Sequence, residues 1–304
     1  MALTYPEAIV IGALQGVAEL FPVSSLGHSI LIPAIIGGRW ATDLDITAKD
    51  SPYLAFVVAL HVATAIALLI FFWRDWIRII GGFFTSIRYR RMQSSNEKLA
   101  WLVIMGTIPV GIAGVALDHA MRSALGSPNP TAVFLALNGL VLLAAERLRR
   151  KSSRVEDQAV AASVGHTDAD LAEESDRRLA RLDLKSGTLV GAAQILALFP
   201  GISRSGATMV AGLVRGLSHE DAARFAFLLA TPVILAAGVL KAPELLGPKA
   251  SGIHGQIIVG SLLSGIGAYI SVRFLTKYFE TRTLTPFAIY CTLAGVGSLI
   301  YLNV

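Results

Sequence analysis

Six long apolar stretches dominate the sequence and leave few folds open to it. A helix needs about 20 residues to cross the roughly 30 Å hydrocarbon core of a bilayer, and each stretch has or approaches that length. Only 15% of the 304 residues are charged, whereas soluble domains carry about 25%. We therefore predict an all-α polytopic membrane protein with six transmembrane helices. These are 54–73, 99–117, 131–145, 225–243, 253–272 and 284–302.

Basic residues in the connecting segments predict the orientation of these helices. Loops 74–98 and 273–283, and the start of segment 146–186, are rich in Lys and Arg. Cytoplasmic loops of membrane proteins carry this excess, so we place all three on the inner side of the membrane. The same rule accounts for the sequence pI of about 9.5. We therefore expect no nucleic-acid partner.

The segment 146–186 is predicted to be a polar cytoplasmic linker between two halves of one membrane domain. Charges of both signs are concentrated in it, in contrast to the rest of the chain. A short helix is expected near 168–182, and we assign the segment no chemistry. The single domain is 1–304, and its two halves are 1–145 and 187–304.

Two further apolar segments, 6–36 and 187–217, are interrupted in the middle by Pro, Gly and Ser. Exposed backbone at membrane depth is tolerated only where protein or a water-filled cavity covers it. We predict that each segment forms a re-entrant helix–loop–helix hairpin that does not cross the bilayer. Each contains a Phe-Pro dipeptide and is followed by three predicted spans. Because the hairpins would enter from opposite sides, the halves would form an inverted repeat whose hairpins meet near the midplane.

The first hairpin carries polar residues that an apolar segment does not ordinarily include. Gln15 and Glu19 are four residues apart and share one helix face. Ser24, Ser25 and His28 follow the interruption. An ionisable residue within an apolar span costs about 2.5–3.5 kcal/mol on insertion scales. Glu19 and His28 together therefore indicate function rather than helix packing.

Arg204 is the distinctive residue of the second hairpin. Its planar guanidinium suits phosphate, and the half-helix beginning near it directs a positive end toward an anion. Gly201 and Gly206 would let backbone N–H groups converge on that anion. A structural ion pair between Arg204 and Glu19 is the alternative interpretation, and the two roles are compatible. Further donors in this loop are Ser203, Ser205 and Thr208.

The two hairpins resemble the motifs of the undecaprenyl-pyrophosphate phosphatases, the bacitracin-resistance type of polyprenyl pyrophosphatase. QGVAELFPVSSLGH at 15–28 and FPGISRSGAT at 199–208 carry the resemblance, which the runs at 60–76 and 227–238 extend. It covers the chain except 146–186. The resemblance implies a bacterial inner-membrane enzyme whose pocket opens to the outer face. It also implies that the enzyme converts C55 polyprenyl pyrophosphate into the monophosphate carrier of peptidoglycan synthesis and inorganic phosphate.

The resemblance implies roles for individual residues as well. Glu19 would be the essential carboxylate, Ser25 the nucleophile or a phosphate ligand, and His28 a general acid/base. Arg204 would be the phosphate clamp. The family needs a divalent cation, Mg2+ or Ca2+, with Glu19 and Gln15 as candidate ligands. Many members have Glu in place of Gln15, so this chain would supply one negative charge fewer, and the cation site would be weaker or completed by the substrate's own phosphates. The implied substrate-binding residues are Ser24, Gly201, Ser203, Ser205, Gly206 and Thr208.

These residues predict phosphoryl transfer. Arg204 and the cation would neutralise the pyrophosphate, Ser25 or a water beside it would attack the terminal phosphorus, and Glu19 or His28 would take the proton. A flippase or transporter of the polyprenyl phosphate carrier is the main alternative, because inverted repeats with broken helices are typical of secondary transporters. The sequence leaves oligomeric state open, a homodimer included.

Three further features receive structural interpretations. His61 lies inside the first full span, where hydrogen bonding between helices is the first interpretation and lining of the pocket is the second. Gly12 and Gly16 form a small-xxx-small face that predicts close helix packing. Tyr290, near the end of the last span, fits an interfacial aromatic belt.

Overall fold

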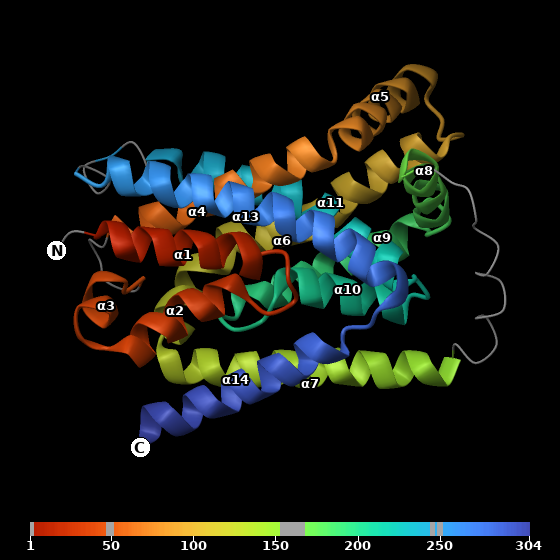
Figure 1. The fold of residues 1–304 in the computed structure, drawn as a ribbon. Helices are drawn as coiled ribbons and strands as arrows, with labels where there is room; N and C mark the ends of the chain where they lie inside the picture. The colour runs from red at the N-terminus through yellow and green to blue at the C-terminus, as the bar shows by residue number, and fades with distance from the viewer. Residues whose placement is uncertain (1–2, 47–51, 153–167, 244–246, 248–251) are drawn as a thin grey trace.

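A computed structural model describes residues 3–46, 52–152, 168–243, 247 and 252–304, and within those ranges all regular secondary structure is helical. Most helices run side by side along one axis, with both termini near the same end of the bundle (Figure 1). They are α1 (Tyr5–Ala18), α2 (Ser25–Ile36), α3 (Gly38–Asp43), α4 (Pro52–Phe71), α5 (Trp73–Tyr89), α6 (Ser95–Leu125), α7 (Pro128–Ser152), α8 (Asp168–Leu179), α9 (Leu184–Ala192), η2 (Ala193–Leu198), α10 (Arg204–Val214), α11 (His219–Leu240), α13 (His254–Thr281) and α14 (Thr285–Asn303).

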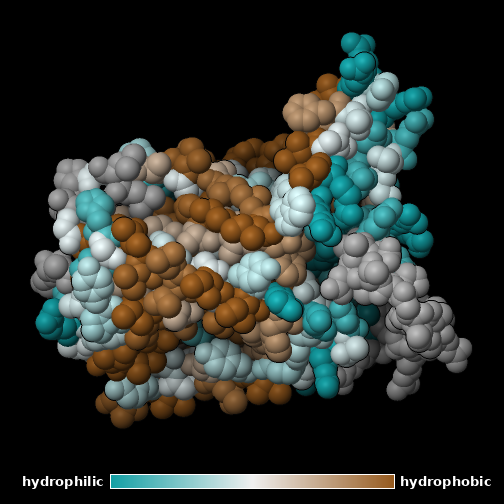
Figure 2. Space-filling model, turned by 45° about the horizontal axis from the view of Figure 1, so that its top comes forward, coloured by the Kyte–Doolittle hydropathy of each residue, from teal (hydrophilic) through white to brown (hydrophobic). Residues whose placement is uncertain are grey.

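Six helices have the length and apolar composition needed to cross a bilayer, which confirms the six-span, all-helical prediction. Large apolar side chains such as Ile112, Leu262 and Leu293 are exposed on them. Figure 2 shows a broad apolar surface over the bundle, as expected where lipid is the solvent. The six helices are α4, α6, α7, α11, α13 and α14.

The two interrupted segments form shorter helices inside the bundle. α1 and α2 are joined by residues 19–24, and η2 and α10 by residues 199–203. Pro22 and Pro200 lie in these loops, and proline ends a helix because it lacks a backbone N–H and clashes with the preceding turn. The interruptions predicted from the sequence are therefore where the helices end.

Glycines allow α1 to pack closely against α13. A Cβ atom at Gly12 would lie 2.6 Å from the carbonyl oxygen of Gly260, and one at Gly16 would meet the carbonyl of Ser264. Only glycine permits this approach, so the predicted small-xxx-small packing face is confirmed. The close packing fixes α1, and with it the residues that follow at the α1–α2 loop.

The connection 74–98, predicted to be a loop, is largely helical. α5 follows α4 almost directly and projects from the bundle before α6 returns (Figure 1). One face of α5 is buried through Ile79 and Gly82, and Gly82 lies against the backbone of Asn96 at the start of α6. The arginines in this stretch obscured an apolar period of three to four residues that favours a helix.

Buried ion pairs attach the linker helix α8 to the bundle. Asp176 is 1% exposed, and its carboxylate accepts hydrogen bonds from Arg224 of α11 at 2.9 Å and from Arg78 of α5 at 3.1 Å. Both arginines also pair with Asp75. The short helix predicted in the linker is thus confirmed and belongs to the packed structure, whereas residues 153–167 lie outside the described residues.

Candidate active site

Glu19 lies at the centre of a polar cluster inside the bundle. It is the C-cap residue of α1 and is 8% exposed. Arg204 forms an ion pair with its Oε1 atom, while Ser25 and Gln15 donate hydrogen bonds to Oε2, the latter at 3.0 Å. Residues of α1, α2 and α10 therefore meet at one carboxylate. The structure brings together the two loops that we expected to meet, and it contains the alternative ion pair as well.

His61 of α4 also contacts this carboxylate. Its Nε2 atom lies 3.2 Å from Oε2 of Glu19, and its Nδ1 atom lies 2.8 Å from the carbonyl oxygen of Val57. A carbonyl only accepts hydrogen bonds, so Nδ1 carries a proton and Nε2 is the atom presented to Glu19. This contact joins α4 to the end of α1, which is the first interpretation of His61, and it also brings the ring into the polar cluster around Glu19.

The two loops touch along their backbones through glycine. A Cβ atom at Gly27 would lie 3.1 Å from Cα of Gly201, and one at Gly206 would lie 3.2 Å from Cβ of Pro22. Gly201 has a φ of 107°, a conformation that residues with side chains rarely adopt, and it lies against the backbone of α7. These glycines permit close packing, whereas the binding of an anion by their N–H groups stays a prediction.

Asn138 of α7, which was not among the predicted site residues, holds both loops at once. Its Nδ2 atom donates to the carbonyl of Pro22 at 3.0 Å, and its Oδ1 atom accepts from the N–H of Ser203 at 3.1 Å. The side chain is 3% exposed. Buried backbone groups need a partner, and Asn138 supplies one to each loop. No local pattern signals this, since its partners are 116 and 65 residues away.

Ser24 begins α2 in an uncommon backbone conformation. It is the N-cap residue, its hydroxyl accepts a hydrogen bond from the N–H of Gly27 at 3.2 Å, and its φ is 66°. Few residues other than glycine have a positive φ, and they are often found at functional sites. The cap starts the helix so that Ser25 faces Glu19.

His28 is turned toward α14, with both ring nitrogens occupied. Nδ1 lies 2.7 Å from the carbonyl oxygen of Ser24 and therefore donates to it, and Nε2 lies 2.6 Å from the hydroxyl of Tyr290 and accepts from it. Tyr290, predicted to lie in an interfacial belt, is thus a second residue of the site that the sequence motifs do not indicate. The predicted acid/base role of His28 stays a prediction.

The hydroxyl groups predicted as substrate donors bond within the protein. The Ser203 hydroxyl caps α10 by accepting from the N–H of Gly206 at 3.1 Å, and Ser205 donates to the carbonyl of Phe21 at 3.2 Å. Thr208 donates to the carbonyl of Arg204 at 2.8 Å. In this arrangement they fix the loops and the start of α10, whose positive end lies at Arg204.

The oxygens beside Glu19 fit a divalent cation that is shared with a phosphate. Oε1 of Gln15 is buried and lacks a hydrogen-bond partner among the described residues, and it belongs to the side chain that donates to Glu19. In the same ranges, no group of three or more His, Cys, Asp or Glu could hold a metal. Mg2+ is commonly bound by one or two carboxylates and substrate phosphates, and the donors here suit that mode.

The fold and the site together define a class of protein. It is a polytopic helical membrane protein whose buried serine and carboxylate face an arginine, between two loops within the bundle. Such a site can bind phosphate through the guanidinium and remove a proton from the hydroxyl. The chain belongs to the family described as bacitracin resistance protein BacA, which matches residues 8–297.

Relatives extend over almost the whole chain. An undecaprenyl-diphosphatase of Mycolicibacterium paratuberculosis is 62% identical over 300 residues, covering 99% of this chain and 98% of that protein. Undecaprenyl-diphosphatase 1 of Frankia casuarinae is 49% identical, with 97% of each chain covered. Undecaprenyl-diphosphatase 2 of Chromobacterium violaceum is 42% identical, covering 97% of this chain and 98% of that protein.

Proposed function

We infer that this chain is an undecaprenyl-diphosphatase, which hydrolyses undecaprenyl pyrophosphate to undecaprenyl phosphate and inorganic phosphate. Two findings support the inference: membership of the family, and 62% identity over nearly the full length to a protein of that name. The structural observation that most supports the inference is the contact of Arg204 with Glu19, because it holds a guanidinium suited to anions beside a serine–carboxylate pair. The product would be the lipid carrier that peptidoglycan synthesis uses again, in the inner membrane of a bacterium.

Binding begins with an exchange of partners at Arg204. In the structure its guanidinium is neutralised by Glu19. A terminal phosphate, which carries more negative charge than a carboxylate and offers matching oxygens, would compete for the guanidinium. The polyprenyl tail would stay in lipid while the headgroup enters the polar cluster. Charge neutralisation is generally the largest contribution to catalysis of phosphoryl transfer, and Arg204 would supply part of it together with the cation.

Glu19 is the best placed group to take the proton. The Ser25 hydroxyl already donates to its Oε2 atom, whereas both nitrogens of His28 are engaged elsewhere. As Oγ of Ser25, or a water that Ser25 orients, bonds to the terminal phosphorus, its proton passes to Glu19 and the P–O bond to the lipid monophosphate breaks. In the serine route, water then cleaves the phosphoserine and releases inorganic phosphate.

We propose that Glu19 and Gln15 hold the divalent cation, Mg2+ or Ca2+, together with the substrate. The unpaired Oε1 atom of Gln15 supports this assignment. When bound, the cation would supply positive charge to the pyrophosphate oxygens. A single protein carboxylate suits a cation that arrives with the substrate rather than one held permanently.

We also propose that the α1–α2 and α9–α10 segments are re-entrant and that the halves 1–145 and 187–304 form an inverted repeat. The shortness of these helices and the prolines in their loops support re-entry. The basic segments gather at one end of the bundle, where α5 and α8 lie (Figure 1). The positive-inside rule makes that end cytoplasmic, and we expect the site to open to the opposite, outer face.

Phosphate release from purified protein tests the proposal. The chain should release phosphate from C55 pyrophosphate in the presence of Mg2+ or Ca2+ and lose activity with a chelator. Glu19→Ala and Arg204→Ala should each reduce the rate by orders of magnitude while keeping the elution profile of the parent. Near-parental rates in either variant would remove this mechanism.

The same preparation separates the enzyme from a transporter. A flippase would move polyprenyl phosphate across a liposome bilayer without releasing phosphate. Transport without hydrolysis would therefore replace the proposed function, whereas hydrolysis in detergent, where no compartment exists, supports it.

A further inference from the structure

Helix α5 carries an apolar stripe that no described residue covers. Its members recur at alternating intervals of four and three residues, which places them on one helix face. The opposite face, which includes Ile79 and Gly82, is buried against the bundle. The stripe consists of Trp73, Ile77, Ile80, Phe84 and Ile87, each at least half exposed.

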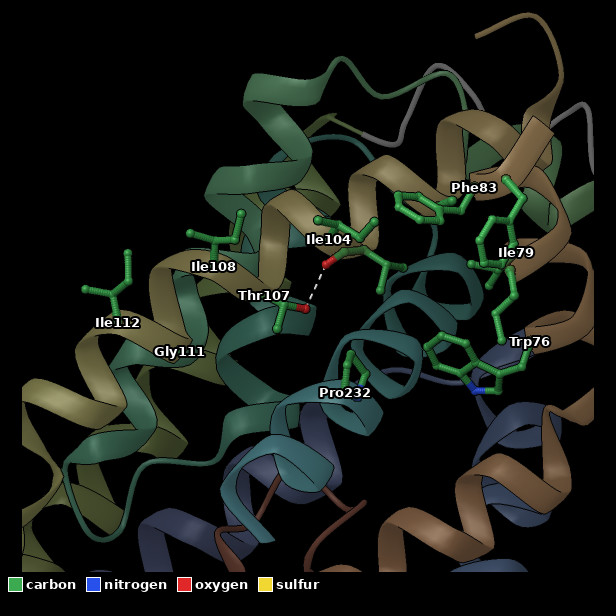
Figure 3. Close-up of a pocket in the computed structure, with 13 residues that line it drawn as sticks. Trp76, Ile79, Phe83, Ile104, Thr107, Ile108, Gly111, Ile112 and Pro232 are labelled. Atoms are coloured by element: carbon green, nitrogen blue, oxygen red, sulfur yellow. Dashed lines mark hydrogen bonds between the residues drawn. The ribbon is translucent and has the colours of Figure 1, made fainter. Parts of the chain in front are cut away.

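An apolar cavity of about 630 Å3 lies beside this stripe, between α5, α6 and α11. Figure 3 shows Trp76 of α5 and Ile104 of α6 on its walls, with Pro232 of α11 closing one side. The hydroxyl of Thr107 donates to the carbonyl of Val103 at 2.7 Å and so offers the cavity no free donor. The volume is that of a ligand pocket, and its walls are almost entirely apolar, with the buried indole N–H of Trp76 as the one donor there that lacks a partner among the described residues, so they suit a hydrocarbon group.

The far end of α5 is positively charged. Arg88, Arg90 and Arg91 are all exposed there, and among the described residues none of them forms an ion pair. The carboxylates of the connection are engaged elsewhere, Asp75 with buried arginine and Glu97 with backbone N–H groups. Figure 2 shows the projecting lobe that α5 forms, apolar toward the bundle and hydrophilic at its tip. An apolar groove thus ends at a cationic surface.

We propose that α5 and its cavity form a binding site for an anionic phospholipid, with an acyl chain in the cavity and the phosphate headgroup at Arg88, Arg90 and Arg91. Basic residues beside an apolar helix face select anionic lipid. A second copy of this chain would bring two positive ends together, which disfavours a dimer through this stripe. No residue that lines the cavity belongs to the candidate active site, so the substrate tail is not the expected occupant. The proposal does not depend on phosphatase activity.

Fluorescence quenching of Trp76 tests the site directly. Trp40→Phe, Trp73→Phe and Trp101→Phe leave Trp76 as the single tryptophan of the full chain, reconstituted with phosphatidylglycerol or phosphatidylcholine carrying brominated acyl chains. We expect brominated phosphatidylglycerol to quench Trp76 at a lower lipid fraction than brominated phosphatidylcholine does. Replacing Arg88, Arg90 and Arg91 by Gln should reduce that preference about tenfold or more. The matched control removes the same charge from α13 and its end, at Arg273, Lys277 and Arg282, and should leave the preference intact.

Filling the cavity gives an independent measurement. Gly111 lines the cavity, and a Cβ atom there would meet nothing within 4 Å, so Gly111→Leu should displace the acyl chain. Gly114→Leu is the control, since that glycine has equal space but does not line the cavity. Native mass spectrometry of the chain with its four tryptophans intact should show retained phosphatidylglycerol in the parent and in Gly114→Leu, but not in Gly111→Leu. Equal retention in all three, equal quenching by both lipids, or displacement of the lipid by polyprenyl pyrophosphate would overturn the proposal.

Discussion

One carboxylate serves four neighbours in this protein. Glu19 accepts hydrogen bonds from Ser25 and Gln15, pairs with Arg204 and lies within contact distance of Nε2 of His61. Removing any neighbour leaves a buried charge with fewer partners, and buried charges are costly unless they are paired. The effects of single substitutions around Glu19 on the free energy of unfolding should therefore be coupled, so that the effect of a double substitution differs from the sum of the two single ones.

Gln15 is the residue at which the cation requirement can be adjusted. Gln15→Glu would add a second carboxylate on the helix face of Glu19, and cation affinity rises with the number of charged ligands. We expect the free Mg2+ or Ca2+ concentration for half-maximal phosphate release to fall about tenfold, or about 1.4 kcal/mol. Gln15→Met, of similar length but without an oxygen, should raise it. Identical cation curves for all three proteins would show that Gln15 is not a ligand.

His28 provides a test of position against proton transfer. The amide of His28→Asn can still donate to the Ser24 carbonyl, as Nδ1 does in the parent. If His28 mainly fixes the loop, His28→Asn should keep kcat within about tenfold of the parent while His28→Ala loses more. Steady-state rates over a range of pH measure both. A general acid/base role predicts that the two variants are equally impaired.

At the scale of elements, α7 anchors both loops through hydrogen bonds from Asn138. Asn138→Ala would leave the Ser203 N–H buried without its partner, at about 1–3 kcal/mol, and would leave the Pro22 carbonyl with only the weak thiol donor Cys291, whose Sγ lies 3.7 Å away. We expect a lower unfolding temperature and a lower kcat, because the distance between Ser25 and Arg204 is no longer fixed.

The matched control for Asn138 lies on the same helix. Asn129 is exposed and bonds to Asn303 at 3.4 Å, so Asn129→Ala should change neither quantity measurably. Thermal unfolding in detergent and phosphate release under saturating substrate report the two effects. A parental kcat in Asn138→Ala would mean that the loops keep their arrangement without it.

Elements with a strong local pattern were predictable, and contacts between distant elements were not. Hydropathy located the six spans because bilayer thickness fixes their length, and helical periodicity placed Gln15 and Glu19 on one face. Tyr290 meets His28 across 262 residues, which no local pattern encodes. In α5 the apolar period was present, but the arginines favoured a loop. The paired motifs indicated that Arg204 and Glu19 would meet, whereas Asn138 emerged only from packing.

At the scale of the whole molecule, the linker is fastened to the bundle by buried charge. Asp176→Asn would leave Arg224 and Arg78 sharing a single carboxylate, that of Asp75. We expect destabilisation of about 1–3 kcal/mol, seen as a fall of several degrees in the unfolding midpoint. Glu173→Gln is the control, because it removes the same charge from the same helix at an exposed pair with Arg177, where the loss should stay below about 1 kcal/mol. Equal midpoints for both variants would show that α8 is only loosely attached.

The backbone conformation of Ser24 makes thermal stability and catalytic rate compete at one position. Its left-handed conformation costs a residue with a side chain about 1–3 kcal/mol, and a glycine would adopt it freely while losing only a few tenths of a kcal/mol as a helix cap. Ser24→Gly should thus raise the unfolding temperature. Because the neighbouring Ser25 would be held less firmly, the same substitution should lower kcat. Selection for thermostability alone would therefore favour glycine at position 24, whereas selection for rapid turnover would retain Ser24.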